Sequence, residues 1–198
     1  MRIRPTLAAV IAMCGLQQLY CDATAAADCQ PTLAGRPPLF ETTFELGGGE
    51  RTHRQLLLPS GTDILIFARE RGIDIRLEVM RDGKIAAVSD SPIFRTGTQR
   101  ATFTAVPGAT YAIDLVAKEY TSARGHVDVR AVALQTGAAE NECVELQRSL
   151  AAADSQFATG QLVTLGLRAS SETDAAAAYA TSAKGYARIA ETLATASS

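Results

Sequence analysis

Apolar and charged residues alternate strictly in the middle of the chain. Between Ile73 and Val79, four large aliphatic side chains alternate with three charged ones. In an extended strand this spacing places the apolar residues on one face and the charged residues on the other. Asp82-Gly83 follows, a dipeptide that tolerates the positive φ angles of a two-residue turn, and 85–88 returns the chain. The stretch predicts a half-buried antiparallel hairpin.

Similar short apolar patterns precede and follow this hairpin, separated by glycine, proline and polar residues. They occupy residues 39–46, 51–58, 62–69, 99–106, 111–115 and 124–134. Turn signals about every ten residues are typical of an antiparallel β-sandwich or barrel rather than of alternating β and α units. We expect about eight strands in a jelly-roll-like sandwich, mainly β with helices at the C-terminal end. The run 62–69 is apolar on both faces, which predicts that both are covered.

The pattern changes to a helical period after Glu140. Cys143, Leu146, Leu150, Ala153 and Phe157 recur at three- and four-residue steps, which predicts an amphipathic helix that stops near Gly160. A second, alanine-rich helix opens near Ser171. The larger residues of one face of this helix form a candidate partner-binding surface: Tyr179, Tyr186, Ile189 and Leu193. The helices either dock on the sandwich or hold a partner chain, a second copy included.

The first 27 residues have the pattern of a secretory signal peptide. Arg2 and Arg4 precede a short apolar run, and Ala25, Ala26 and Ala27 supply the small residues of a cleavage site. Cys21 would be the anchor of the alternative, a lipoprotein signal, but bulky residues precede it. The sequence therefore predicts a signal peptide at 1–27, a sandwich at 28–137 and a helical segment at 138–198. The mature protein is expected to be periplasmic or secreted, without stable membrane insertion.

Composition limits the classes of function. The chain of 198 residues has 19 basic and 21 acidic residues, so it lacks the positive charge expected for binding nucleic acid or an anionic membrane. His53 and His126 lie in predicted strands, and we expect both to be surface histidines. The sequence contains no HExxH pair, no nucleophile elbow, no phosphate-binding glycine loop and no calcium loop. We expect no enzyme, no cofactor and no resident metal, with a calcium site among Asp74, Asp82 and Asp90 as the alternative.

A family resemblance covers residues 40–134. Its motifs are the aspartate-led strand after Gly72, the Asp82-Gly83 turn, Ser89-Asp90-Ser91, the strand 101–105 and the corner 107–111. In this order they resemble the bacterial pre-peptidase C-terminal (PPC) domain, a small secreted β-sandwich. The resemblance implies an accessory module of exported proteases or cell-surface proteins, with a role in binding or targeting rather than catalysis.

The alanine-rich helix is similar to the first helix of a tetratricopeptide repeat (TPR). A secreted sandwich followed by such helices resembles the N-terminal part of longer bacterial proteins that carry a caspase-like CHAT domain. Our main hypothesis is a non-enzymatic binding module that contacts a protein through its helices. The alternative is an accessory or truncated part of a secreted protease or CHAT-domain protein. A carbohydrate-binding sandwich is a third hypothesis, although the chain has no Trp.

Cys29 and Cys143 are the two cysteines that remain after cleavage of the signal peptide. In an oxidising compartment they are expected to form a disulfide, which by the chain-entropy model adds about 4–5 kcal/mol of stability. The alternatives are two free thiols or a two-cysteine metal site. Intact mass before and after alkylation without reductant tests the prediction, because two alkylated thiols would contradict it.

Overall fold

The computed structural model describes residues 36–92, 95–118, 123–134, 138–165 and 172–196. Of 138–143, 172 and 193–196 it describes the helix but not the side chains. The predicted signal peptide and Cys29, and the side chains of Cys143 and Leu193, therefore lie outside the described residues. The elements in chain order are β1 (Phe40–Gly47), β2 (Arg51–Leu56), β3 (Asp63–Arg71), β4 (Ile75–Arg81), β5 (Lys84–Ser89), β6 (Thr98–Thr104), β7 (Tyr111–Ala117), β8 (Arg124–Leu134), α3 (Ala138–Thr164) and α4 (Glu172–Ala196).

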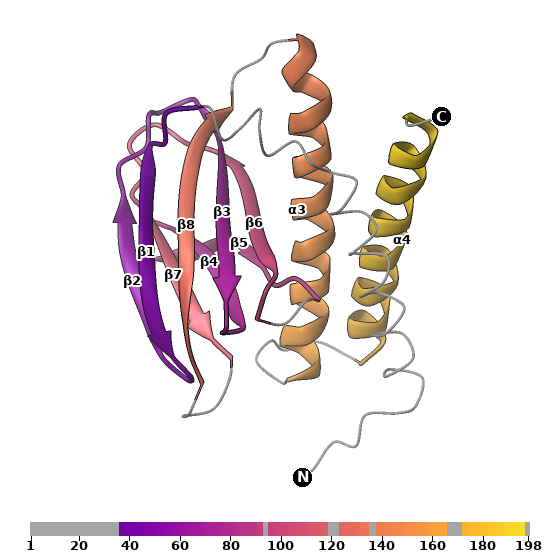
Figure 1. The fold of residues 1–198 in the computed structure, drawn as a ribbon, viewed down its shortest axis with the longest axis horizontal. Coiled ribbons are helices and arrows are strands. Elements are labelled where there is room, and N and C mark those ends of the chain that lie inside the picture. The colour runs from indigo at the N-terminus through magenta and orange to yellow at the C-terminus, as the bar shows by residue number, and fades with distance from the viewer. Residues whose placement is uncertain (1–35, 93–94, 119–122, 135–137, 166–171, 197–198) are drawn as a thin grey trace.

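The eight strands form two antiparallel sheets with jelly-roll connections. Sheet A has the order β1-β8-β3-β6 and sheet B the order β2-β7-β4-β5. Chain neighbours such as β1 and β2 lie in different sheets, so most connections cross from one sheet to the other. In Figure 1 the strands of the two sheets overlap in the view, and the helical pair lies to one side of them. The predicted class, mainly β with C-terminal helices, is confirmed.

The apolar face predicted for β4 lies in the core between the sheets. Ile75, Leu77 and Val79 are fully buried there. The turn after β4 is also as predicted, because Asp82 and Gly83 have φ angles of 50° and 74°. Such positive angles suit a turn that follows the right-handed twist of the two strands. Local alternation and turn chemistry therefore give the hairpin β4–β5 directly.

Helix α3 covers part of the outer face of sheet A, on the side of β6. Leu65 of β3 and Val132 and Leu134 of β8 form a second apolar cluster with Val144 of the helix. This cluster accounts for the two-sided apolar pattern of β3, whose Ile64 and Ile66 point into the sandwich core. In Figure 1 α3 runs along β6 and β5, and α4 lies on the far side of α3. The helical segment thus packs on the sandwich.

The apolar stripes of α3 and α4 face each other. Leu150, Ala153 and Phe157 of α3 form one buried cluster with Tyr186 and Ile189 of α4. Two glycines allow this close approach. A Cβ atom on Gly160 would lie 2.8 Å from the ring of Tyr179, and one on Gly185 would lie 3.1 Å from Cβ of Ala153.

The prediction that the first helix stops near Gly160 is wrong, because α3 continues to Thr164. Gly160 serves helix packing rather than helix termination. The structure shows one helical hairpin, and the resemblance of α4 to a tetratricopeptide repeat stays a prediction.

A buried polar contact fixes the hairpin on the sandwich. Nε of Arg100 in β6 donates to Oε1 of Gln147 at 3.0 Å, and its Nη1 lies 3.6 Å from Oδ2 of Asp154. Tyr186 of α4 donates its hydroxyl to Oδ1 of Asp154 at 2.6 Å. The chain of contacts thus runs from β6 through α3 to α4. Since a buried guanidinium without acceptors costs several kcal/mol, these contacts specify how the helices sit.

The core position of Leu77 can be tested against an exposed position in the same hairpin. Leu77 is 0% exposed, whereas Ile85 in β5 is 54% exposed. We expect Leu77→Asp to unfold the domain, because burying an unpaired carboxylate costs several kcal/mol out of a total of about 5–15 kcal/mol. Ile85→Asp should melt close to the wild type. Equal melting of the two variants would contradict the assignment of faces.

Candidate functional site

The two outer faces of the sandwich differ. That of sheet A is partly covered by α3, whereas on sheet B a group of charged side chains lies over the centre of the sheet. Glu78 of β4 and Asp114 of β7 are direct cross-strand neighbours on this face. Two carboxylates side by side repel each other unless cations lie between them. Arg51 of the edge strand β2 supplies such a cation, and Nδ1 of His53 on the same strand contacts Asp114.

Hydrogen bonds fix the geometry of this group of side chains. Oδ1 of Asp114 lies 2.5 Å from Nδ1 of His53, and its Oδ2 accepts hydrogen bonds from Nη2 and Nε of Arg51 at 2.5 and 3.1 Å. Nη2 of Arg51 also lies 2.8 Å from Oε2 of Glu78. Oε1 of Glu78 accepts from Nε of Arg76 at 2.9 Å. Each carboxylate oxygen is therefore held by a donor from its own or another strand.

Burial separates the donors from the acceptors. The side chains of Glu78 and Asp114 are 3% and 5% exposed, whereas those of Arg51 and His53 are 50% and 59% exposed. The hydrogen bond to Asp114 raises the pKa of Arg51, so the guanidinium group stays protonated. The face thus presents guanidinium and imidazole groups to solvent with their orientation fixed from beneath. We call Arg51, His53, Arg76, Glu78 and Asp114 the β2 cluster.

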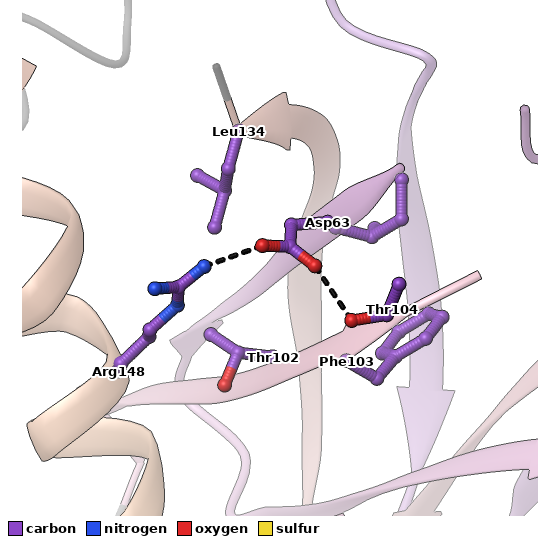
Figure 2. Close-up of a pocket in the computed structure, with 7 residues that line it drawn as sticks. Asp63, Thr102, Phe103, Thr104, Leu134 and Arg148 are labelled. Atoms are coloured by element: carbon purple, nitrogen blue, oxygen red, sulfur yellow. Dashed lines mark hydrogen bonds and ion pairs between the residues drawn. The ribbon is translucent and has the colours of Figure 1, made fainter. Parts of the chain in front are cut away.

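A small pocket lies elsewhere, at the seam between α3 and the end of sheet A. Its volume is about 170 Å³, and Asp63, Thr102, Phe103, Thr104, Leu134 and Arg148 are among its lining residues. Figure 2 shows Arg148 reaching from α3 to Asp63, with Nη2 and Oδ2 2.5 Å apart, while Thr104 donates to the other oxygen of Asp63 at 2.6 Å. The charges in this pocket are already paired with each other, so it is a structural contact between α3 and β3.

A third polar group is sealed inside the sandwich. Oε1 of Glu70 accepts from the amide of Gln99 at 2.8 Å and from the backbone N–H of Ile75 at 2.9 Å. Its Oε2 accepts from the N–H of Gly97 at 3.1 Å. Burial raises the pKa of Glu70 to about 8, although the hydrogen bonds oppose this shift. Glu70 holds the chain before β4 against the start of β6 and faces no solvent.

Beside Glu70 lies a lysine between two aspartates. Nζ of Lys118 is 2.6 Å from Oδ1 of Asp90 and 3.0 Å from Oδ2 of Asp74. The alternative of a calcium site at Asp74, Asp82 and Asp90 therefore meets an ammonium group in the place of a metal. Asp82 faces away, since its Oδ1 accepts from the N–H of Thr110 at 2.8 Å. Within the described parts of the chain no three His, Cys, Asp or Glu side chains are arranged to hold a metal ion.

Residues 69–81 mix arginines with Glu70, Asp74 and Glu78, a pattern that predicts a solvated face. This prediction is wrong for the three carboxyl groups, which are all buried. Alternation gives the direction of a side chain but not what covers it. Arg51 covers Glu78, Lys118 covers Asp74, and an amide and backbone N–H groups hold Glu70. The sequence gives one signal for this: Asp114 and Lys118 are isolated charges in or next to an otherwise apolar strand.

The face predicted to bind a partner through the helices is occupied by α3. Tyr186 and Ile189 are buried in the α3–α4 cluster, and Tyr179 is partly buried against Phe157. Of the two open alternatives, docking on the sandwich is the one that the structure shows. His53 belongs to the β2 cluster, while His126 lies exposed on β8.

Among the described residues, no helix is both long enough and apolar enough to cross a membrane. No protein-family model and no curated protein matches the sequence. Solved structures with a partly similar fold include the pre-peptidase C-terminal domain of a collagenase from Bacillus anthracis. The two share 18% identity with a TM-score of 0.39, over 48% of this chain and 90% of that one.

A second similar structure is Aeromonas hydrophila PliG, a periplasmic inhibitor of g-type lysozyme, with 11% identity and a TM-score of 0.34 over 47% of this chain and 85% of that one. A third is the sugar-binding C-terminal domain of EclA, with 12% identity and a TM-score of 0.31 over 47% and 79% of the two chains. At these scores the likeness describes part of the fold and assigns no function.

The buried carboxyl groups predict that stability depends on pH. Burial raises the pKa of Glu70 to about 8, of Asp90 to about 7 and of Asp154 to about 6. The folded chain therefore holds these protons more tightly than the unfolded chain does, and the free energy of unfolding falls as pH rises between the unfolded and folded pKa values. We expect a lower melting temperature at about pH 8.5 than at about pH 5.

Glu70→Gln should flatten this dependence, because it removes the largest of the three contributions. Its melting temperature at low pH should also fall, since an amide nitrogen then faces donors such as the N–H of Gly97. Glu41→Gln, at an exposed position on β1, is the matched control and should keep the wild-type slope. A wild-type melting temperature that rises with pH over this range would contradict the prediction.

Proposed function

We propose that the chain is an exported, non-catalytic binding module that recognises an extended acidic segment of a partner protein along strand β2. The proposal combines the signal-peptide pattern of residues 1–27 with the geometry of the β2 cluster. Its main support is a single observation: the carboxylates of the cluster are buried, whereas Arg51 and His53, its donors on β2, are exposed. A surface of this kind attracts a ligand rich in acceptors.

The position of β2 favours an extended ligand. Among the described strands β2 pairs with β7 alone and forms one edge of sheet B. An edge strand can accept another strand, with main-chain hydrogen bonds giving affinity and alternate side chains giving specificity. Arg51, His53 and Gln55 alternate along the outer face of β2, at the spacing of alternate side chains in an added strand.

The order within the cluster supports selectivity for acidic side chains. Asp114 contacts both Arg51 and His53, so neither donor has to be immobilised when a ligand binds. Preorganisation lowers the entropy cost of association. Charge on an edge strand also discourages pairing with a second copy, because like charges would face each other. An acidic ligand strand would pair with the positive charge of β2, whereas a neutral ligand strand would leave that charge without a partner of opposite sign.

A catalytic role has less support in the geometry. The β2 cluster lies on an open sheet face, where water has access to any bound group, and the pocket at Asp63 lies elsewhere. Glu70, Asp90 and Asp154, whose pKa values are raised, are all buried. Perturbed carboxyl groups away from any cleft stabilise structure more often than they catalyse.

Binding can be measured by calorimetry with two synthetic peptides, one alternating Glu with Val and the other alternating Gln with Val. We expect the Glu peptide to bind more tightly at low salt. The double variant Arg51→Gln, His53→Gln should weaken its binding about tenfold or more, because a charge-assisted hydrogen bond is worth about 1.5–3 kcal/mol. Equal binding of the two peptides would overturn the proposal.

The matched control is the double variant Arg124→Gln, His126→Gln. These residues have the same spacing and are exposed, but β8 lies inside sheet A and offers no edge. This variant should bind the acidic peptide as the wild type does. Gln55→Glu adds a negative charge to β2 without touching Asp114, and it should weaken binding with an unchanged melting temperature. If Gln55→Glu binds normally, β2 is not the recognition strand.

A further inference from the structure

Lys118, Asp74 and Asp90 meet at one end of sheet B, although they come from three different connections. Lys118 follows β7, Asp74 precedes β4 and Asp90 follows β5. The backbone N–H of Lys118 donates to the carbonyl oxygen of Asp74 at 3.0 Å, which fixes the start of the lysine side chain. Nζ of Lys118 then lies 2.6 Å from Oδ1 of Asp90 and 3.0 Å from Oδ2 of Asp74.

The three side chains are shielded from water. Those of Lys118 and Asp90 are 15% and 0% exposed. Oδ2 of Asp90 has no hydrogen-bond partner among the described residues, so only the lysine engages this carboxyl group there. A buried acid with one oxygen uncommitted is costly as an ion pair. The arrangement therefore calls for an explanation beyond stabilising charge.

An amine and a carboxyl group held in contact, away from water, are the reactants of an amide. In solution the reaction fails, because the groups meet rarely and water favours the ions. In a fold that holds them within 2.6 Å, proximity replaces the bimolecular step. Burial disfavours the ammonium group of Lys118, but Asp90 and Asp74 outweigh this effect and raise its pKa, so a neighbouring base has to take its proton. A neighbouring carboxylate can carry the proton, as in other general acid–base reactions.

We propose that Lys118 and Asp90 form an intramolecular isopeptide bond, with Asp74 as the proton carrier. The carboxylate of Asp74 takes one proton from the ammonium group of Lys118, and the free amine attacks Cγ of protonated Asp90. The Nζ–Cγ bond forms, the Cγ–OH bond breaks, and a second proton from Nζ leaves with the hydroxyl as water. Asp74 ends protonated, and no oxidant, reductant or further reactant is needed.

Asp90, rather than Asp74, is the acyl donor. Its carboxyl oxygen is closer to Nζ than that of Asp74, and its side chain is more deeply buried. Burial raises the pKa of Asp90 to about 7, so the protonated form that can lose water is well populated near neutral pH. Asp74 is near enough to Nζ to exchange protons with it.

The bond would join the ends of β5 and β7 on either side of β4. In sheet B β4 lies between these two strands, and β5 is the edge strand opposite β2. A covalent link at this position would prevent β5 from separating from the sheet. Such a link would suit the exported module proposed above.

Mass spectrometry of the purified full chain, reduced and alkylated, tests the proposal directly. We expect an intact mass lower than that of the sequence by one water. Digestion with trypsin should give one branched peptide that contains both Asp90 and Lys118, since trypsin cannot cleave after an acylated lysine. An intact mass without water loss, together with cleavage after Lys118, would show an ion pair only and would overturn the proposal.

Variants separate the bond from other losses of water. Lys118→Arg keeps the positive charge but should restore the full mass. A succinimide at Asp90 does not involve Lys118, so its water loss would persist in this variant. Asp74→Asn keeps the contact between Lys118 and Asp90 but should leave the bond unformed. Lys184→Arg, at an exposed lysine of α4, is the control and should keep the water loss. A branched peptide that persists in Asp74→Asn would contradict the role of Asp74.

Discussion

The packing of α3 on the outer face of sheet A decides which surface of the sandwich is left for a ligand. The apolar contact of Leu65 and Val132 with Val144 supplies buried area but little orientation. Orientation comes from Arg100, whose guanidinium group reaches Gln147 and Asp154 of the helix. A shift of the hairpin would remove the two side-chain acceptors of this charge on the helix. The helical hairpin therefore covers the β6 side of the outer face of sheet A, and the charged face of sheet B stays open.

Buried carboxylates also hold the sandwich together, because they contact residues that lie far apart in the sequence. Asp114 holds Arg51, which is 63 residues away, and Asp90 holds Lys118, which is 28 residues away. A carboxylate accepts hydrogen bonds from several directions, so one side chain can connect several strands. On the sheet B face this places negative charge beneath and positive charge outside. The electrostatic character of the open surface is thus a result of how the sandwich is held together.

The strands could be predicted from the sequence, because their signals are local. Alternation from Ile73 to Val79 and the Asp82-Gly83 turn depend on neighbours in the chain, and the structure confirms both. The candidate site could not be predicted, because the cover over Glu78 comes from Arg51 on another strand. The prediction of a helix stop at Gly160 was wrong for a similar reason: the missing side chain makes room for the ring of Tyr179 in α4. Local chemistry specified the elements, and distant partners specified burial.

Strand β7 connects the open face to the buried lysine. It carries Asp114, pairs with β2 on one side and with β4 on the other, and leads directly into Lys118. A partner bound to β2 is connected to β7 through the hydrogen bonds between the two strands. The end of β7 is in turn tied to Asp90, beyond β4, by the contact of Lys118. Fixing β7 at that end keeps Asp114 in register beneath Arg51 and His53, so the contact with Asp90 and the order of the exposed donors depend on the same strand.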